Sequence, residues 1–328
     1  MSKVTRRYWA GGLLICATFA IWSIPEPAFA QNLQGKTIRI INPFAAGGTT
    51  DVVARLIAGQ VSEDGKQSVI VETRVGAGSV VGSAQVARSA PDGTNILMVS
   101  NSFIINSLLR TDLPYETMSM QPLCMLVEST QVLVVNAASS YGTFNDFIDD
   151  ARRRPNELNY ASSGPATSQH IAGETLKRQA GISITYVSFQ GGAPAVNALL
   201  GNHLTSVLTN YTEVKELIDA GKLRALAVGS RQRLKSLPDV PTIDELGYKD
   251  VVGTAFFGIV APPNTPSAKS DELIKMISTA LNAPNVISSL EAQGLQVAQK
   301  CGAEFGSYLR DLRLTYEQAI RLTGIELK

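Results

Sequence analysis

Two glycines followed by hydroxyl and acidic residues make residues 47–51 the stretch of this sequence best suited to bind a ligand. The apolar run before them predicts a strand, and threonine and aspartate are common where a helix begins. A glycine turn at such a corner exposes backbone N–H groups, which together with the helix dipole favour a carboxylate or a phosphate. A tight turn that binds nothing fits the same residues equally well. The candidate ligand-binding residues of this first corner are Phe44, Gly47, Gly48, Thr49, Thr50 and Asp51.

A second glycine corner, residues 191–194, repeats the pattern with a proline in the first turn of the helix that follows. The other loops after predicted strands contain mainly serine, threonine and asparagine. Such neutral donors suit a carboxylate without any salt bridge, because about five hydrogen bonds of roughly 1.5 to 3 kcal/mol each suffice for micromolar binding. The candidate ligand-binding residues here are Ser100, Asn101, Ser102, Ser163, Gly164, Thr167, Ser168, His170, Phe189, Gly191, Gly192, Ala193 and Asn210.

Asp51 and Arg55 are one helical turn apart, so an ion pair between them is expected. We expect Asp51 to order the first corner from behind. The alternative is that Asp51 receives the ammonium group of an amino-acid ligand.

Residues for catalysis or metal binding are scarce. The two histidines, His170 and His203, have no Gly-x-Ser-x-Gly motif or nearby cysteine, and no cluster has metal-ligand spacing. We expect His170 to begin a helix beside the ligand site and His203 to be solvated. The glycines of residues 76–82 have one residue too many for a dinucleotide fingerprint. We therefore expect no catalytic residue, no metal and no cofactor.

The chain alternates predicted strands and helices from residue 36 onward, which is typical of an α/β protein with mostly parallel sheets flanked by helices. Serine and glycine loops separate the elements. Strands are expected at 38–41, 68–72, 95–99, 131–135, 158–161, 184–187, 204–208, 223–228 and 255–260. Helices are expected at 51–63, 79–89, 144–153, 170–179, 193–200 and 214–220, with a helical tail whose apolar stripe, residues 305–320, packs on the first lobe.

Two of the expected strands, 131–135 and 255–260, separate two runs of strand–helix units, so we expect two lobes joined by two hinge crossings. Lobe 1 comprises residues 31–131 and 256–328, and lobe 2 comprises residues 132–255. A hinge between open sheets places a ligand cleft at the carboxyl ends of the strands. One glycine corner from each lobe would then face the other, and a ligand with two carboxylates would bridge them.

The first 30 residues predict a secretory signal peptide cleaved after Ala30. Basic residues precede an apolar run from Trp9 to Ile24, and Ala28-Phe29-Ala30 is a typical cleavage pattern. A retained membrane anchor is the alternative. The expected location is periplasmic.

Charge and cysteine content limit the possible partners. Removing the 3 basic and 1 acidic residues of the leader from totals of 29 and 28 leaves 26 basic and 27 acidic residues. A nearly neutral chain without a basic stripe is not expected to bind nucleic acid. Cys124 and Cys301 could form one disulfide in an oxidising compartment, but sequence gives no distance between them, so two unpaired cysteines are expected.

The chain after residue 30 resembles the tripartite tricarboxylate transporter substrate-binding family, also called the Bug receptors. The match does not rest on one motif. The similar segments, in order, are Pro43-Phe44 with residues 47–51 and Ala54-Arg55, Val71-Glu72 with Arg74, Gly76-Ala77-Gly78, Pro91-Asp92-Gly93, Leu113-Pro114-Tyr115, residues 158–164, residues 221–228 and residues 237–242.

This resemblance implies a type II periplasmic-binding-protein fold and a monomeric receptor. Such a receptor captures a small mono-, di- or tricarboxylate between its lobes and delivers it to a membrane permease of the tripartite tricarboxylate type. Phe189-Gln190 departs from the Tyr-Lys or Tyr-Arg common in the family, which adds less polar or aromatic acids to the candidates. The ligand itself is not predicted.

Two other functions are compatible with the sequence. A periplasmic sensor that reports a ligand to a membrane kinase would use the same fold, and co-purification with a permease or a kinase would distinguish them. A periplasmic hydrolase would turn over esters in a reaction dependent on His170, but the missing nucleophile motif argues against it.

Overall fold

The computed structural model describes Met1 and residues 33–64, 67–249, 251 and 253–325. The expected signal peptide and its cleavage site after Ala30 lie outside the described residues. The described residues from Leu33 to Ile325 belong to one compact unit, Asn32–Lys328. Among the described residues, no helix combines the length and apolarity needed to cross a membrane.

The strands of this unit form one mixed sheet. Their order is β2-β1-β3-β9-β4-β7-β5-β6, with β10 and β8 also paired to β4. β1 is parallel to β2 and β3, β5 is parallel to β6 and β7, and β9 is antiparallel to β3 and β4. The strands are β1 Ile38–Asn42, β2 Val69–Thr73, β3 Asn95–Ser100, β4 Gln121–Asn136, β5 Asn159–Ser162, β6 Thr185–Ser188, β7 Ser206–Asn210, β8 Leu223–Val228, β9 Thr254–Ala261 and β10 Leu295–Cys301.

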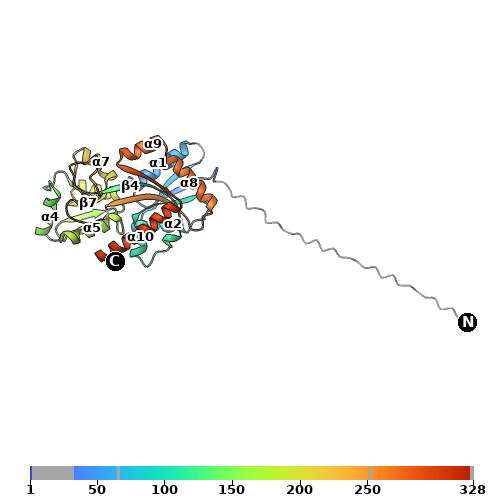
Figure 1. Ribbon diagram of the computed structural model, residues 1–328, viewed down its shortest axis with the longest axis horizontal. Helices are drawn as coiled ribbons and strands as arrows, with labels where there is room; N and C mark the ends of the chain where they lie inside the picture. The colour runs from blue at the N-terminus through green and yellow to red at the C-terminus, as the bar shows by residue number, and fades with distance from the viewer. Residues whose placement is uncertain (2–32, 65–66, 250, 252, 326–328) are drawn as a thin grey trace. The chain divides into compact units, whose positions relative to one another are not determined.

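The helices lie near both ends of this sheet. Figure 1 shows α1, α8 and α9 towards one end and α4, α5 and α7 towards the other, with β4 running between them. The α-helices are α1 Thr49–Glu63, α2 Val80–Ala87, α3 Asn101–Leu109, α4 Phe144–Arg153, α5 Ser168–Ala180, α6 Gly192–Leu200, α7 Tyr211–Asp219, α8 Ser267–Leu281, α9 Pro284–Ala292 and α10 Ala303–Thr323. The expected alternation of strands and helices is therefore confirmed. The tail contains the expected helical structure in α8, α9 and α10, whereas α3 and the strand β10 were not expected.

β4 is the strand that both halves of the sheet share. Its residues 121–130 pair with β9, while residues 131–136 pair with β7 and β8. Only residues 131–135 were expected in a strand, because 121–130 contain a proline and do not alternate. Most of the strand is buried, so both of its faces tolerate apolar residues.

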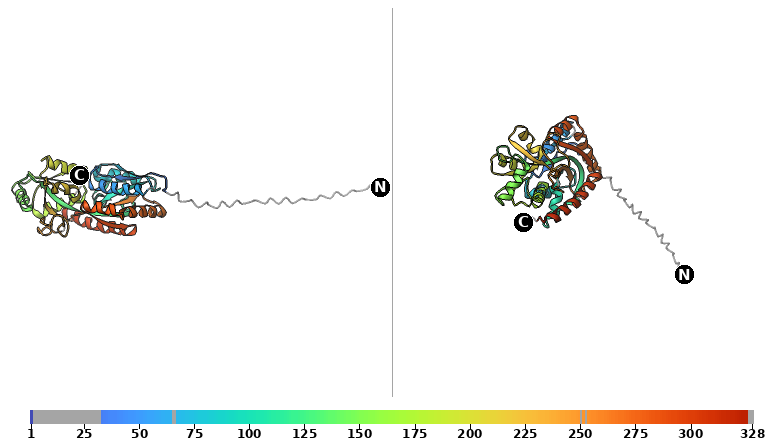
Figure 2. Two further views of the ribbon diagram at one scale, coloured as in Figure 1. Left: turned by 90° about the horizontal axis from the view of Figure 1, so that it is seen from above. Right: turned by 60° about the vertical axis from the view of Figure 1, so that its left-hand side comes forward.

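Separate apolar cores pack on the two halves of the sheet. Ile40, Val53 and Leu273 belong to one core of the half that contains β1, and Phe147, Leu176 and Leu208 belong to one core of the half that contains β5. In Figure 1 and the left view of Figure 2, the green-to-yellow elements after β4 gather at one end and the blue elements at the other. The two halves are thus separately packed but continuous through β4.

The tail was expected to pack on the first lobe alone, but helix α10 contacts elements of both halves of the sheet. Phe305 and Leu309 lie in a core with β3 and β9, whereas Tyr316 is buried beside Ala166 and Ile171 of the α5 region. The apolar stripe of α10 therefore contacts elements of both halves.

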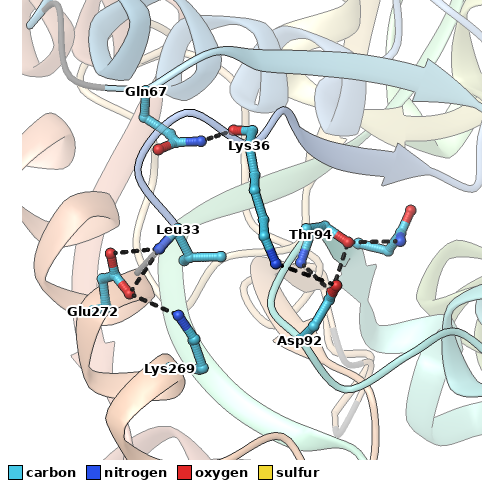
Figure 3. Close-up of polar contacts among 8 residues, drawn as sticks. Leu33, Lys36, Gln67, Asp92, Thr94, Lys269 and Glu272 are labelled. Carbon is cyan, nitrogen blue, oxygen red and sulfur yellow. Dashed lines mark hydrogen bonds and ion pairs between the residues drawn. The ribbon is translucent and has the colours of Figure 1, made fainter. Parts of the chain in front are cut away.

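Leu33 and Lys36, which precede β1, make polar contacts with α8 and with Asp92, shown in Figure 3. The Leu33 amide donates to Glu272 Oε1 at 3.2 Å, and Lys269 Nζ lies 3.5 Å from Glu272 Oε2. Lys36 Nζ lies 3.9 Å from Asp92, and the Leu33 side chain is fully buried. Burial of Leu33 and these contacts hold the entrance to β1 in place.

Cys124 and Cys301 form a disulfide, which corrects the expectation of two unpaired cysteines. The two residues are register partners in the antiparallel pair of β4 and β10, with their Cα atoms 4.0 Å apart. Because β10 was not expected, the proximity of Cys301 to Cys124 could not be predicted from the sequence.

We predict that the double variant Cys124→Ala/Cys301→Ala unfolds more easily than the wild type. The bridge closes a loop with a sequence separation of 177 residues, and removing such a bridge costs about 2 to 5 kcal/mol. Urea unfolding with and without a reducing agent measures this difference. The reductant should destabilise the wild type and leave the variant unchanged; equal stability of all samples would contradict the prediction.

Candidate functional site

A small cavity lies where loops from both halves of the sheet meet, with a volume of about 30 Å³. Small, hydroxyl and amide residues dominate its lining. Among the lining residues, all of which belong to the described part of the chain, there is no lysine or arginine. The predicted residues that line it are Phe44, Gly48, Thr50, Ser100, Ser163, Thr167, Ser168, Gly191, Gly192 and Asn210, and the additional ones are Gln169, Glu213, Ala255 and Phe257.

The first glycine corner joins β1 to α1. Gly47 has a φ of 82°, which favours glycine, and Gly48 is the residue that caps α1. Asp51 accepts hydrogen bonds from the Gly47 amide at 3.0 Å and from Arg55 Nε at 2.9 Å. Burial alone would raise the pKa of Asp51, but the hydrogen bonds from Arg55 and Gly47 outweigh it and lower that pKa. Asp51 is thus placed to order the corner from behind.

The second glycine corner joins β6 to α6 and touches the first corner directly. The Ala45 amide donates a hydrogen bond to the Gln190 carbonyl at 3.0 Å. Gly191 has a φ of 140°, and a Cβ added there would lie 3.2 Å from Ala45 Cβ. Glycine is therefore required at 191 both by the backbone conformation and by the close approach of the other corner.

Hydroxyl groups at the start of α5 form a third side of the cavity. Thr167 caps α5 by accepting a hydrogen bond from the His170 amide at 3.3 Å, and Ser168 Oγ accepts one from Gln131 Nε2 at 2.7 Å. Ser163 Oγ is buried and has no hydrogen-bond partner among the described residues. A buried hydroxyl that lines a cavity without a partner is available to a polar ligand.

Amide side chains connect the cavity wall across the two halves. Gln169 Nε2 donates to Asn210 Oδ1 at 3.2 Å, and Asn210 Nδ2 donates to Thr49 Oγ1 at 3.2 Å. Thr49 therefore supports Asn210 without lining the cavity itself. This chain links α5, β7 and α1 at the site.

Glu213 is the one carboxylate among the described residues that line the cavity, and the sequence prediction missed it. The Thr49 amide donates to Glu213 Oε1 at 3.1 Å, and the hydroxyls of Thr49 and Thr209 also bond to the carboxylate. α7 was expected to begin at Val214, but it begins at Tyr211, so Glu213 lies in its first turn. Glu213 follows the end of β7 in the sequence, and ligands bind at the carboxyl ends of strands in such sheets, so this position could have marked it as a site residue.

Nine of the predicted residues do not line the cavity. Asn101 begins α3, where it bonds to the Tyr316 hydroxyl at 2.6 Å and to the Phe256 amide at 2.9 Å; residues 100–102 are thus a strand end and a helix start rather than a loop. The Ser102 hydroxyl lies 3.1 Å from that of Ser100. The residues outside the lining are Gly47, Thr49, Asp51, Asn101, Ser102, Gly164, His170, Phe189 and Ala193.

His170 is a buried ring stacked on Tyr186, with 4.0 Å between the ring centroids. Its Nδ1 has no hydrogen-bond partner among the described residues. Burial lowers the pKa of His170 to about 4, with a smaller opposing effect from Glu174. The expected start of a helix at His170 is off by two residues, and His203 is exposed as expected.

A family model for the tripartite tricarboxylate transporter family receptor matches residues 53–320. The chain belongs to this receptor family. The resemblance found in the sequence is confirmed, and the chain is a solute-binding receptor. The described residues contain no group of three or more His, Cys, Asp and Glu side chains placed to hold a metal ion.

Relatives of the receptor align over nearly its whole length. Protein BugT of Bordetella pertussis is 31% identical over 308 residues, which are 93% of this chain and 94% of BugT. The structure of the periplasmic binding protein BugD has a TM-score of 0.85 and 28% identity, covering 89% of this chain and 99% of BugD. The R. palustris protein Rpa4515 with adipate has a TM-score of 0.85 and 26% identity over the same shares. The expected α/β fold of the periplasmic-binding-protein type is therefore confirmed.

We predict that the receptor loses stability in mild acid because of His170. Its folded pKa of about 4 lies below the ordinary value of about 6.5, so the unfolded chain binds more protons between these values. The free energy of unfolding should fall by about 3 kcal/mol in total from this residue as the pH falls from about 6.5 to about 4. His170→Phe preserves the aromatic stack and removes the titration. Urea unfolding at several pH values measures the difference.

The exposed histidine provides the matched control. His203→Asn should keep the wild-type loss of stability in this pH range, whereas His170→Phe should lose less. Parallel pH profiles for all three proteins would contradict the assignment to His170.

Proposed function

We propose that this receptor captures a small carboxylate in the periplasm and delivers it to a membrane permease of the tripartite tricarboxylate type. The observation that carries this proposal is the cavity at the two glycine corners, in whose lining neutral hydrogen-bond donors outnumber the single carboxylate and lysine and arginine are absent among the described residues. The unpartnered Ser163 hydroxyl supplies a donor inside the cavity. Because hydrogen bonds to a charged group are the stronger ones, a carboxylate gains more from these donors than a neutral ligand does. Rpa4515 with adipate supports the same ligand class.

We propose the lobe boundaries expected from the sequence: residues 31–131 with 256–328, and residues 132–255. The change of partners along β4 near Gln131 supports a crossing there, and β9 supports the return crossing. Hinge motion at these two strands would separate Ala45 from Gln190 and open the cavity. With a volume of only about 30 Å³, the cavity must widen before a small organic acid can enter.

The proposed location and partners follow from the family. The leader of residues 1–30, cleaved after Ala30, would deliver the chain to the periplasm, where BugD is a binding protein. We propose that the mature receptor acts as a monomer, without a cofactor or metal, and docks on its permease with the ligand enclosed. Co-purification with a permease supports this assignment, and co-purification with a sensor kinase supports the signalling alternative.

We predict that small carboxylates raise the melting temperature of the purified mature receptor. At about one hundred times its dissociation constant, a ligand adds roughly 2.7 kcal/mol of stability, which is several degrees for a chain of this size. The panel comprises amino acids, aliphatic mono-, di- and tricarboxylates and aromatic acids, tested after unfolding and refolding to remove retained ligand. No shift with any acid would contradict the proposal.

A variant of the first glycine corner tests whether the ligand-induced rise in melting temperature comes from binding in the cavity. The backbone at Gly48 is extended, with a φ of −80°, so Gly48→Val is compatible with the fold but adds bulk 3.3 Å from Glu213 Oε1. This variant should lose the ligand-induced shift. Gly59→Val is the matched control, because Gly59 lies on the exposed side of the same helix with open space around it.

A further inference from the structure

Glu213 occupies a position that the glycine corners would otherwise offer to a ligand. Its carboxylate accepts hydrogen bonds from the amide and hydroxyl of Thr49, at 3.1 and 3.2 Å, and from the Thr209 hydroxyl. Thr49 is the first residue of α1, so its amide is one of the free donors of that helix end. These donors were expected to bind the carboxylate of a ligand. They are instead engaged by the carboxylate of Glu213.

The same carboxylate also fills the space in front of the second corner. A side chain on Gly192, the first residue of α6, would overlap the Glu213 carboxylate. A Cβ on Gly48 would lie 3.3 Å from Glu213 Oε1. Glu213 therefore lies between the first turns of two helices, whose N-terminal ends favour negative charge.

No lysine or arginine among the described residues of the cavity wall offsets this negative charge. The lining residues, all within the described part of the chain, include neither lysine nor arginine. The neighbouring Lys215 on α7 is engaged elsewhere, with its Nζ 2.6 Å from Asp219 and 3.7 Å from Glu216. A second carboxylate on a ligand would meet Glu213 across a small cavity without a neutralising partner, and facing like charges oppose binding.

We propose that Glu213 is a specificity-determining residue that restricts the receptor to acids with a single carboxylate. This inference rests on the proposed function. The ligand's carboxylate bonds to the remaining hydroxyls, Ser163 among them, while the rest of the ligand lies toward Phe44 and Phe257. Glu213 takes the place of a second ligand carboxylate, so the site rejects dicarboxylates by charge and by occupied donors.

The test is isothermal titration calorimetry of the refolded mature receptor with acids paired by carbon skeleton. The pairs are butyrate and succinate, hexanoate and adipate, and benzoate and terephthalate. The wild type should bind at least one monocarboxylate about tenfold or more tightly than its dicarboxylate partner. In Glu213→Gln, which retains the shape but not the charge, that preference should shrink by about tenfold or reverse.

Glu216→Gln is the matched control, because Glu216 lies on the same helix with its side chain 88% exposed. This variant should keep the wild-type preference. Equal or tighter binding of dicarboxylates by the wild type would overturn the inference, as would an unchanged preference in Glu213→Gln. If Glu213→Gln does not fold, the comparison of each monocarboxylate with its dicarboxylate partner in the wild type still tests the inference, because equal or tighter binding of the dicarboxylates would overturn it. Binding of no acid by any folded protein would contradict the proposed function itself.

Discussion

The pairing of β4 with strands at both of its ends is the constraint on which the site depends. One strand, Gln121–Asn136, pairs with β9 and β10 along its first part and with β7 and β8 along its last. Because the two halves of the sheet share this strand, the loops after β1 and β6 meet, and the Ala45 amide bonds to the Gln190 carbonyl. The cavity is a consequence of this shared strand and not of either half alone.

Neutral donors determine what the cavity can hold. Hydroxyls, amides and helix N-termini surround it, and each gains more from an anion than from a neutral group. The protein supplies one anion itself, the Glu213 carboxylate, at the point where α1 and α6 converge. A receptor with a carboxylate of its own at the glycine corners has a more negative site than a receptor whose corners are free to bind the ligand. Two members of one family can therefore share the glycine corners and differ in the acids that they bind.

Local patterns predicted the corners well, whereas features set by distant pairing were missed. Glycines at 47–48 and 191–192 marked both turns because backbone conformation is a local property. Residues 121–130 of β4 lack alternation, since burial on both faces removes it. The disulfide depends on the register of β10 against β4, which no local pattern encodes. Glu213 was missed because α7 begins at Tyr211 instead of Val214.

A crystal structure of the mature receptor with the acid that stabilises it most would locate the ligand directly. We predict that the ligand carboxylate lies in the cavity beside Glu213, within hydrogen-bond distance of Ser163 Oγ and without any contact to lysine or arginine. An acid bound outside this cavity, or held by a basic side chain, would contradict the claim that the neutral donors of the cavity form the binding site.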